Sequence, residues 1–157
     1  GRELDALIAE RLFGWQWRAF IPAHQTEDDF TACIYSPEAF SKEPLDIFGN
    51  KLGVPPLIET TWPALGTESI KHYDWTGLPH YSINVNEAWF VVEKLLETHN
   101  VSIVSNGHGQ YQCSFDIRDG KLRFPIETVH DGDAFANAET APLAICRAAL
   151  KVACKFA

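Results

Sequence analysis

Hydrophobic side chains recur at three- and four-residue spacing in three separate stretches of the chain, and each stretch predicts an amphipathic helix. The most regular stretch follows Asn84, a residue whose side-chain oxygen favours the N-cap position. Glu87, three positions on, predicts a capping box in which its carboxylate reaches back to the Asn84 amide. His99 and Asn100 are expected to end this helix. Its expected buried positions are Val85, Ala88, Trp89, Val92, Leu95 and Leu96.

The other two predicted helices lie near the two ends of the sequence. The first spans Arg2–Phe13 and stops at Gly14, because glycine accepts the left-handed backbone conformation found at many helix ends. The last begins after Thr140 and carries Pro142 in its first turn, where a proline loses no amide partner. The expected buried faces are Leu4, Leu7, Ile8, Arg11 and Leu12 in the first helix, and Ala141, Ala144, Ile145, Ala148, Ala149, Val152 and Ala153 in the last.

Short runs of alternating or β-branched residues predict strands between these helices. A glycine-rich turn at 106–109 joins two strands of a meander, and Asp119-Gly120 is a two-residue hairpin signal that leads to a third. Pro125 favours an edge position for that third strand. The acidic stretch 130–137 is expected to be a loop. The expected strands are residues 15–21, 30–35, 101–105, 111–117 and 122–126.

The whole pattern predicts an α+β fold, in which an antiparallel β-sheet of about four strands has helices packed around it as an α-β-α sandwich. Residues 23–78 are rich in proline and glycine, yet they are too apolar for disorder, so we expect a long ordered insertion. At 157 residues the chain is expected to be a single domain, 1–157, with core elements 2–22 and 80–156 and the insertion 23–78.

Composition narrows the range of partners. A net charge of −8 argues against nonspecific binding to nucleic acid, which depends on Lys and Arg neutralising phosphates. No apolar window is long enough to cross a membrane, so a membrane partner is not expected. The four cysteines show no paired spacing and are interpreted as reduced, mostly buried residues of a protein in the cytoplasm of its host cell.

Three blocks of the sequence together resemble a known family: 3–10 with Gly14-Trp15, 81–95, and 140–151. They are similar to the phage ABA-sandwich domain, a family of small phage and prophage proteins. Ser82 and Trp89 match the family pattern, whereas its Thr-Asp-Ile segment is Ile83-Asn84-Val85 here. The resemblance implies an antiparallel sheet with helices around it and a viral origin. It implies no activity, because fold alone does not supply one.

Common catalytic and nucleotide-binding motifs are absent from the sequence, so no enzyme, metal or cofactor is predicted. Two local groups leave an alternative open. His72 and Asp74, with His80 nearby, are residue types that serve as an acid/base pair of a small hydrolase. The turn 130–133 carries oxygen ligands that suit a cation. Ordinary surface side chains explain both groups more simply.

Aromatic residues in the insertion and at its exit are the best candidates for a binding site. Glycine- and proline-framed loops that carry Trp and Tyr can build a stacking pocket for a planar ligand such as a nucleobase, and an Arg can hold its phosphate. An alternative role for each aromatic is to pin the insertion onto the core. The candidate ligand-binding residues are Trp62, Tyr73, Trp75, Tyr81, Arg18 and Arg123.

The sequence therefore predicts a non-enzymatic phage accessory protein, acting in counter-defence, that binds and sequesters a small host nucleotide signal. Two alternatives remain: a protein-binding inhibitor of a host defence protein, and a hydrolase using His72, Asp74 and His80. Identical subunits often build binding pockets at a twofold interface, so the first interpretation includes a homo-oligomer.

Overall fold

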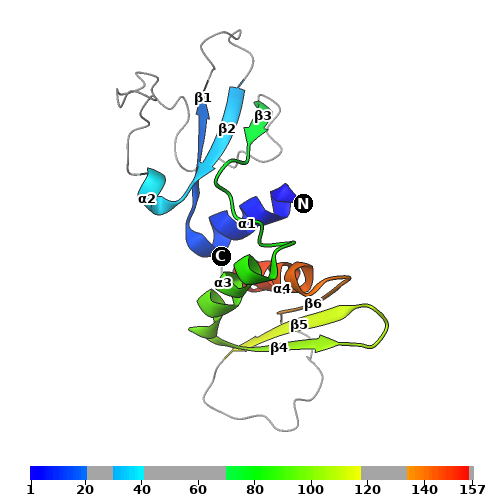
Figure 1. The fold of residues 1–157 in the computed structure, drawn as a ribbon. Coiled ribbons are helices and arrows are strands. Elements are labelled where there is room, and N and C mark those ends of the chain that lie inside the picture. The colour runs from blue at the N-terminus through cyan, green and yellow to red at the C-terminus, as the bar shows by residue number, and fades with distance from the viewer. Residues whose placement is uncertain (21–29, 41–69, 118–133, 156–157) are drawn as a thin grey trace. The chain divides into compact units, whose positions relative to one another are not determined.

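A computed structural model describes residues 1–20, 30–40, 70–117 and 134–155 (Figure 1). The chain divides into two compact units, of which the first combines Gly1–Leu12 with Pro79–Ala157 and the second is Phe13–Leu78. The second unit contains the whole of the expected insertion 23–78, but it begins earlier in the chain and includes the first strand. The single domain with an insertion at 23–78 stays a prediction.

The first unit is a three-stranded antiparallel sheet in the order β4-β5-β6, with helices α3 and α4 on one face (Figure 1). Helix α4 packs against β5 and β6 and also against α3. The elements of this unit are α1 (Arg2–Phe13), α3 (Val85–Leu96), β4 (His99–Ser105), β5 (Tyr111–Ile117), β6 (Ala134–Ala138) and α4 (Ala141–Lys155).

Small residues let α4 lie close to the sheet. Ala136 and Ala138 of β6 are buried, as are Ala144 and Ala148 of α4, and their methyl groups are small enough for the two backbones to approach closely at these positions. Phe115 of β5 fills much of the remaining core. The predicted apolar stripe of this helix is confirmed at Ala144, Ile145, Ala148, Ala149 and Val152.

The start of α3 differs from the predicted capping box. Asn84 does cap the helix, and its side chain accepts the amide of Asn86 at 3.0 Å. The Asn84 amide itself donates to the carbonyl of His80 at 2.9 Å, while the Glu87 carboxylate accepts the amide of His80. Glu87 therefore binds the backbone of the preceding turn and does not reach back to Asn84.

The buried faces of α3 and α1 match the expected faces only in part, with Ala88, Val92 and Leu95 of α3 confirmed. In α3 the buried residues are Ala88, Val91, Val92 and Leu95, whereas Val85, Trp89 and Phe90 are exposed. In α1 they are Asp5, Ala6, Ile8 and Ala9. Ile8 of the expected face is buried, whereas Arg11 is exposed, because the buried Asp5 has a backbone partner in Ser82 and turns its own side of the helix inward. The stop at Gly14 is confirmed, with a φ of 68°.

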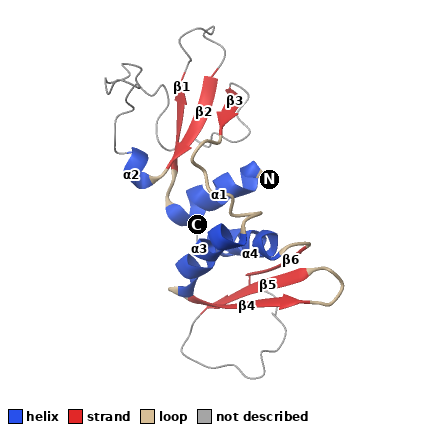
Figure 2. Cartoon of the chain, viewed as in Figure 1, coloured by secondary structure: helices blue, strands red, loops and turns tan. Residues whose placement is uncertain are grey.

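The second unit holds a smaller sheet in the order β1-β2-β3. Strands β1 and β2 are antiparallel, and β2 and β3 are parallel (Figure 2). Its elements are β1 (Gln16–Phe20), β2 (Phe30–Tyr35), α2 (Pro37–Phe40) and β3 (Ile70–Asp74). The α+β class is confirmed, with the strands divided between two three-stranded sheets in place of one sheet of about four.

Strand β6 lies where the sequence predicted an acidic loop, so that part of the interpretation was wrong. Its alternate residues Ala134, Ala136 and Ala138 are buried. The expected strand 122–126, the turn at Asp119-Gly120 and the acidic turn 130–133 lie outside the described residues.

Among the helices that the structure describes, none has the length and apolar character needed to cross a membrane. The four cysteines are free thiols; Cys33, Cys113 and Cys146 are buried as expected, and Cys154 is exposed.

Candidate functional site

Three aromatic rings meet in the second unit. Tyr73 of β3 and Trp75, two positions on, stack with ring centroids 5.3 Å apart and planes 11° apart. Trp17 of β1 meets both rings edge-on, at 5.9 Å from Tyr73 and 6.1 Å from Trp75. Trp17 is buried, whereas Tyr73 and Trp75 are half-buried. The parallel pair therefore rests on Trp17 and retains accessible surface.

The strand register explains why these rings meet. Ala32 of β2 pairs with Tyr73 of β3 and with Ala19 of β1, and Trp17 lies two positions before Ala19 on the same face. Ala32 is fully buried and small. Because β2 presents only a methyl group there, Trp17 reaches across the central strand to Tyr73 of β3 and to Trp75, which follows it.

The remaining predicted ligand residues are placed differently. Tyr81 belongs to the first unit and is 4% exposed. Burial, followed by the nearby charges of Glu87 and Asp5, raises the pKa of Tyr81 to about 12. Arg18 lies in β1 opposite Cys33, and its side chain is outside what the structure describes.

Trp62 and Arg123 lie outside the described residues. Of the expected set, the structure brings together Tyr73 and Trp75. It adds Trp17, which lies in the expected strand 15–21 but was not among the predicted ligand-binding residues.

The candidate acid/base residues are divided between the units. Asp74 Oδ1 accepts the amide of Thr76 at 2.9 Å, and hydrogen bonds from Thr76 are the main reason that the pKa of Asp74 is lowered. His72 belongs to the second unit, and His80 to the first. Arg2 Nη1 lies 2.9 Å from His80 Nδ1, which must accept because arginine only donates. Within the described parts of the chain, no three His, Cys, Asp or Glu residues are grouped to hold a metal ion.

Asp74 also affects the one cysteine of the second unit. Burial, with the charge of Asp74 as the second cause, raises the pKa of the Cys33 thiol to about 11. Cys33 therefore stays protonated at neutral pH, which makes it a poor nucleophile.

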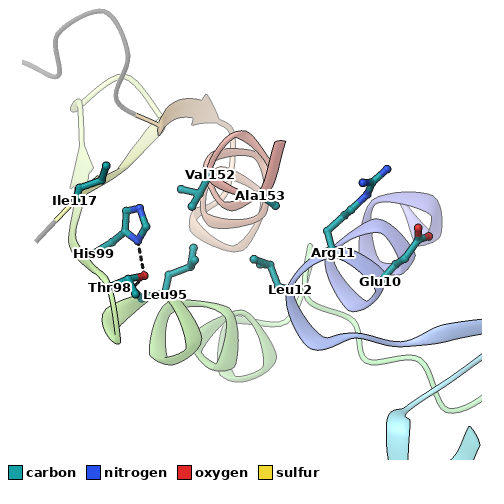
Figure 3. A pocket seen from close by; sticks show the side chains of 9 residues that line it. All are labelled: Glu10, Arg11, Leu12, Leu95, Thr98, His99, Ile117, Val152 and Ala153. Carbon is teal, nitrogen blue, oxygen red and sulfur yellow. Dashed lines mark hydrogen bonds between the residues drawn. The ribbon is translucent and has the colours of Figure 1, made fainter. Parts of the chain in front are cut away.

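The first unit contains a cavity of about 640 Å³ (Figure 3). Its size lies within the range of small-molecule sites, and its walls are mostly aliphatic. His99, at the start of β4, is 5% exposed, and its Nδ1 lies 2.7 Å from Oγ1 of Thr98. Burial lowers the pKa of His99, against a smaller opposing effect of Asp116. The cavity is lined by Glu10, Arg11, Leu12, Leu95, Thr98, His99, Ile117, Val152 and Ala153.

Sequence reasoning did not find this cavity. Its lining residues come from α1, from the end of α3 and the start of β4, from β5 and from α4. These segments share no sequence motif. The one property they have in common in the sequence is that each lies at the end of a predicted helix or strand.

Most of the chain matches a known protein family. The model of the Phage ABA sandwich domain matches residues 6–150, which is most of the chain, and the chain belongs to this family. No curated protein and no solved structure matches it.

Proposed function

We propose that this member of the Phage ABA sandwich domain family is a phage accessory protein that binds a small host nucleotide signal and sequesters it unchanged. The observation that carries the proposal is the parallel pair of Tyr73 and Trp75. The proposed place of action is the cytoplasm of the infected host. Counter-defence by sequestration requires only binding, without a chemical reaction of the ligand.

Stacking provides the binding energy in this proposal. A third planar group can extend the pair of rings, and base–aromatic stacking contributes about 1–3 kcal/mol per base. Trp17 holds both rings from the side, so they lose little freedom when a ligand binds. Pre-organised rings of this kind favour a flat heterocycle over a flexible aliphatic ligand.

The phosphate of the ligand needs a cationic partner. Arg18 and Arg123 remain the proposed partners, because a guanidinium group binds phosphate through two parallel hydrogen bonds. Trp62 remains a proposed further stacking residue. Tyr81 is not part of the proposed site, because its ring is buried in the first unit.

Native mass spectrometry tests the proposal, with the purified protein incubated with a panel of linear and cyclic nucleotides. We expect a bound nucleotide that is released chemically unchanged on denaturation, and at least about tenfold weaker binding by Trp75→Ala, which corresponds to one lost stacking contact. Trp89→Ala is the matched control, because Trp89 is an exposed tryptophan of the first unit.

Two results would overturn the proposal. A chemically altered nucleotide would indicate the hydrolase alternative, and binding that Trp75→Ala leaves intact would exclude the aromatic pair as the site.

A second candidate function has an observation of its own. Trp89 and Phe90 of α3 are 46% and 58% exposed, and Ile83 and Val85 just before them are also exposed. Protein interfaces are enriched in such aromatic residues, which favours an inhibitor that binds a host defence protein. Under this function, Phe90→Asp should abolish co-purification of one defined host protein, and Glu93→Gln on the same helix should not. Co-purification that survives Phe90→Asp would exclude this patch.

A further inference from the structure

Three helices end at the cavity of the first unit. Residues Glu10 to Leu12 belong to the last turn of α1, Leu95 and Thr98 flank the end of α3, and Val152 and Ala153 lie in the last turns of α4. Each helix C-terminus carries about −0.5 of an elementary charge from its unpaired carbonyl groups. The cavity therefore lies where three negative helix ends converge.

The side chains that line the cavity do not cancel this field, and Lys94, in the last turn of α3 and outside the lining, is paired with Glu97 at 3.6 Å. Arg11 is the one permanently cationic residue among the described residues that line the cavity, and Glu10 is beside it. Figure 3 shows the guanidinium of Arg11 and the carboxylate of Glu10 both directed away from Leu12 and Leu95. Two opposite charges that point outward contribute little net charge to the interior.

His99 adds a hydrogen-bond acceptor at the opposite wall. Burial lowers its pKa, which favours the neutral imidazole at neutral pH. Thr98 Oγ1 lies 3.5 Å from the Leu95 carbonyl, to which it donates, and Oγ1 is then the acceptor for Nδ1–H of His99. In this tautomer Nε2 is an acceptor. The ring therefore adds no positive charge to the cavity.

We propose that this cavity binds a small molecule with an apolar body and one cationic ammonium group. The apolar body lies against Leu12, Leu95 and Val152, and the ammonium group lies toward the carbonyl ends of the three helices. The site and its ligand class are independent of the nucleotide site proposed for the second unit, because the residues belong to different units.

A matched set of ligands tests the charge preference. Naphthylmethylamine is cationic at neutral pH, naphthylmethanol is neutral, and naphthoate is anionic, while the aromatic body is the same. We expect calorimetric titration of the full chain to give about tenfold tighter binding of the amine than of naphthoate, a factor that corresponds to about 1.4 kcal/mol. The neutral alcohol should lie between them.

Variants locate the binding to the cavity. Ala153→Phe fills the space and should abolish binding of the amine, whereas Cys154→Phe adds the same ring at the exposed neighbouring position and should not. Arg11→Gln removes the one positive side chain of the lining and should tighten amine binding about two- to fivefold, as expected for a partly screened charge.

Several outcomes would overturn the inference: naphthoate binding as tightly as the amine, no binding of any of the three ligands, or amine binding that Ala153→Phe leaves unchanged. Amide chemical shifts from nuclear magnetic resonance check the fold of each variant. They also separate binding at Leu95 and Val152 from binding at Trp75.

Discussion

The carboxylate of Asp5 accepts the backbone amide of Ser82 at 2.7 Å, and this contact joins residues 77 positions apart. Asp5 is 1% exposed, and its second oxygen pairs with Arg2 at 3.0 Å. Arg2 also donates to the carbonyl of Pro79 at 3.1 Å. One buried carboxylate thus fastens α1 to the segment that leads into α3.

Asp5→Ala should destabilise the first unit strongly. The change leaves the buried Ser82 amide without its acceptor and removes the carboxylate that pairs with the half-buried Arg2, and these two losses together cost about 3 kcal/mol. Urea unfolding followed by circular dichroism measures the loss. Glu3→Ala, an exposed acidic position of the same helix, should change stability by less than about 0.5 kcal/mol. An equal loss of stability in Asp5→Ala and Glu3→Ala would contradict the role of Asp5.

Ser82→Ala, in contrast, should not destabilise the first unit. The Ser82 hydroxyl is buried and has no hydrogen-bond partner among the described residues. Because a buried hydroxyl without a partner costs free energy, its removal should leave stability unchanged or raise it by about 1 kcal/mol. The same urea experiment checks this. A loss of more than about 1 kcal/mol would show that the hydroxyl is satisfied in the folded protein.

His99 should make the first unit sensitive to acid. Its pKa is lowered by burial from the ordinary value of 6.5, so the unfolded chain binds a proton more readily than the folded protein. The stability contributed by neutral His99 is therefore complete above 6.5 and falls as the pH drops below that value. Urea midpoints between about pH 5 and pH 8 should decline toward acid more steeply in the native protein than in His99→Gln. The same dependence of the urea midpoint on pH in the native protein and in His99→Gln would contradict this role of His99.

Trp17→Ala should unfold much of the second unit. Trp17 is buried and contacts both Tyr73 and Trp75, and truncation of a buried aromatic to alanine costs about 3–5 kcal/mol. Thermal denaturation followed by near-ultraviolet circular dichroism reports on these rings. Trp89→Ala removes an exposed tryptophan and should shift stability by about 0.5 kcal/mol or less. A small effect of Trp17→Ala would mean that the three rings do not hold the sheet together.

Periodicity predicted α1, α3 and α4 and the strands β1, β2, β4 and β5, because each presents a regular apolar pattern. Strand β6 was not predicted because alanine has little strand preference, and its place in the sheet comes from packing under α4. The capping box failed at Glu87 for a similar reason, since a partner seven residues earlier replaced the local one.

The candidate sites differ in how far the sequence indicated them. Tyr73 and Trp75 are two positions apart, so their shared face could be anticipated from the chain alone. The third ring, Trp17, joins them only through a small residue on the intervening strand. The cavity forms where the ends of four segments meet in the folded chain. The residue pattern of any one segment does not predict this meeting.

The first unit is made of two segments that are far apart in the sequence, so its fold is completed late in synthesis. Helix α1 emerges from the ribosome before the Ser82 amide that donates to Asp5 has been made, and the intervening 13–78 segment is a compact unit by itself. The first unit can therefore complete its fold only after residues 79–157 have been synthesised, later than the second unit. Because the entropic cost of closing a loop rises with the length of the loop, a second unit that has already folded lowers the cost of bringing α1 to Ser82 and speeds the docking of α1.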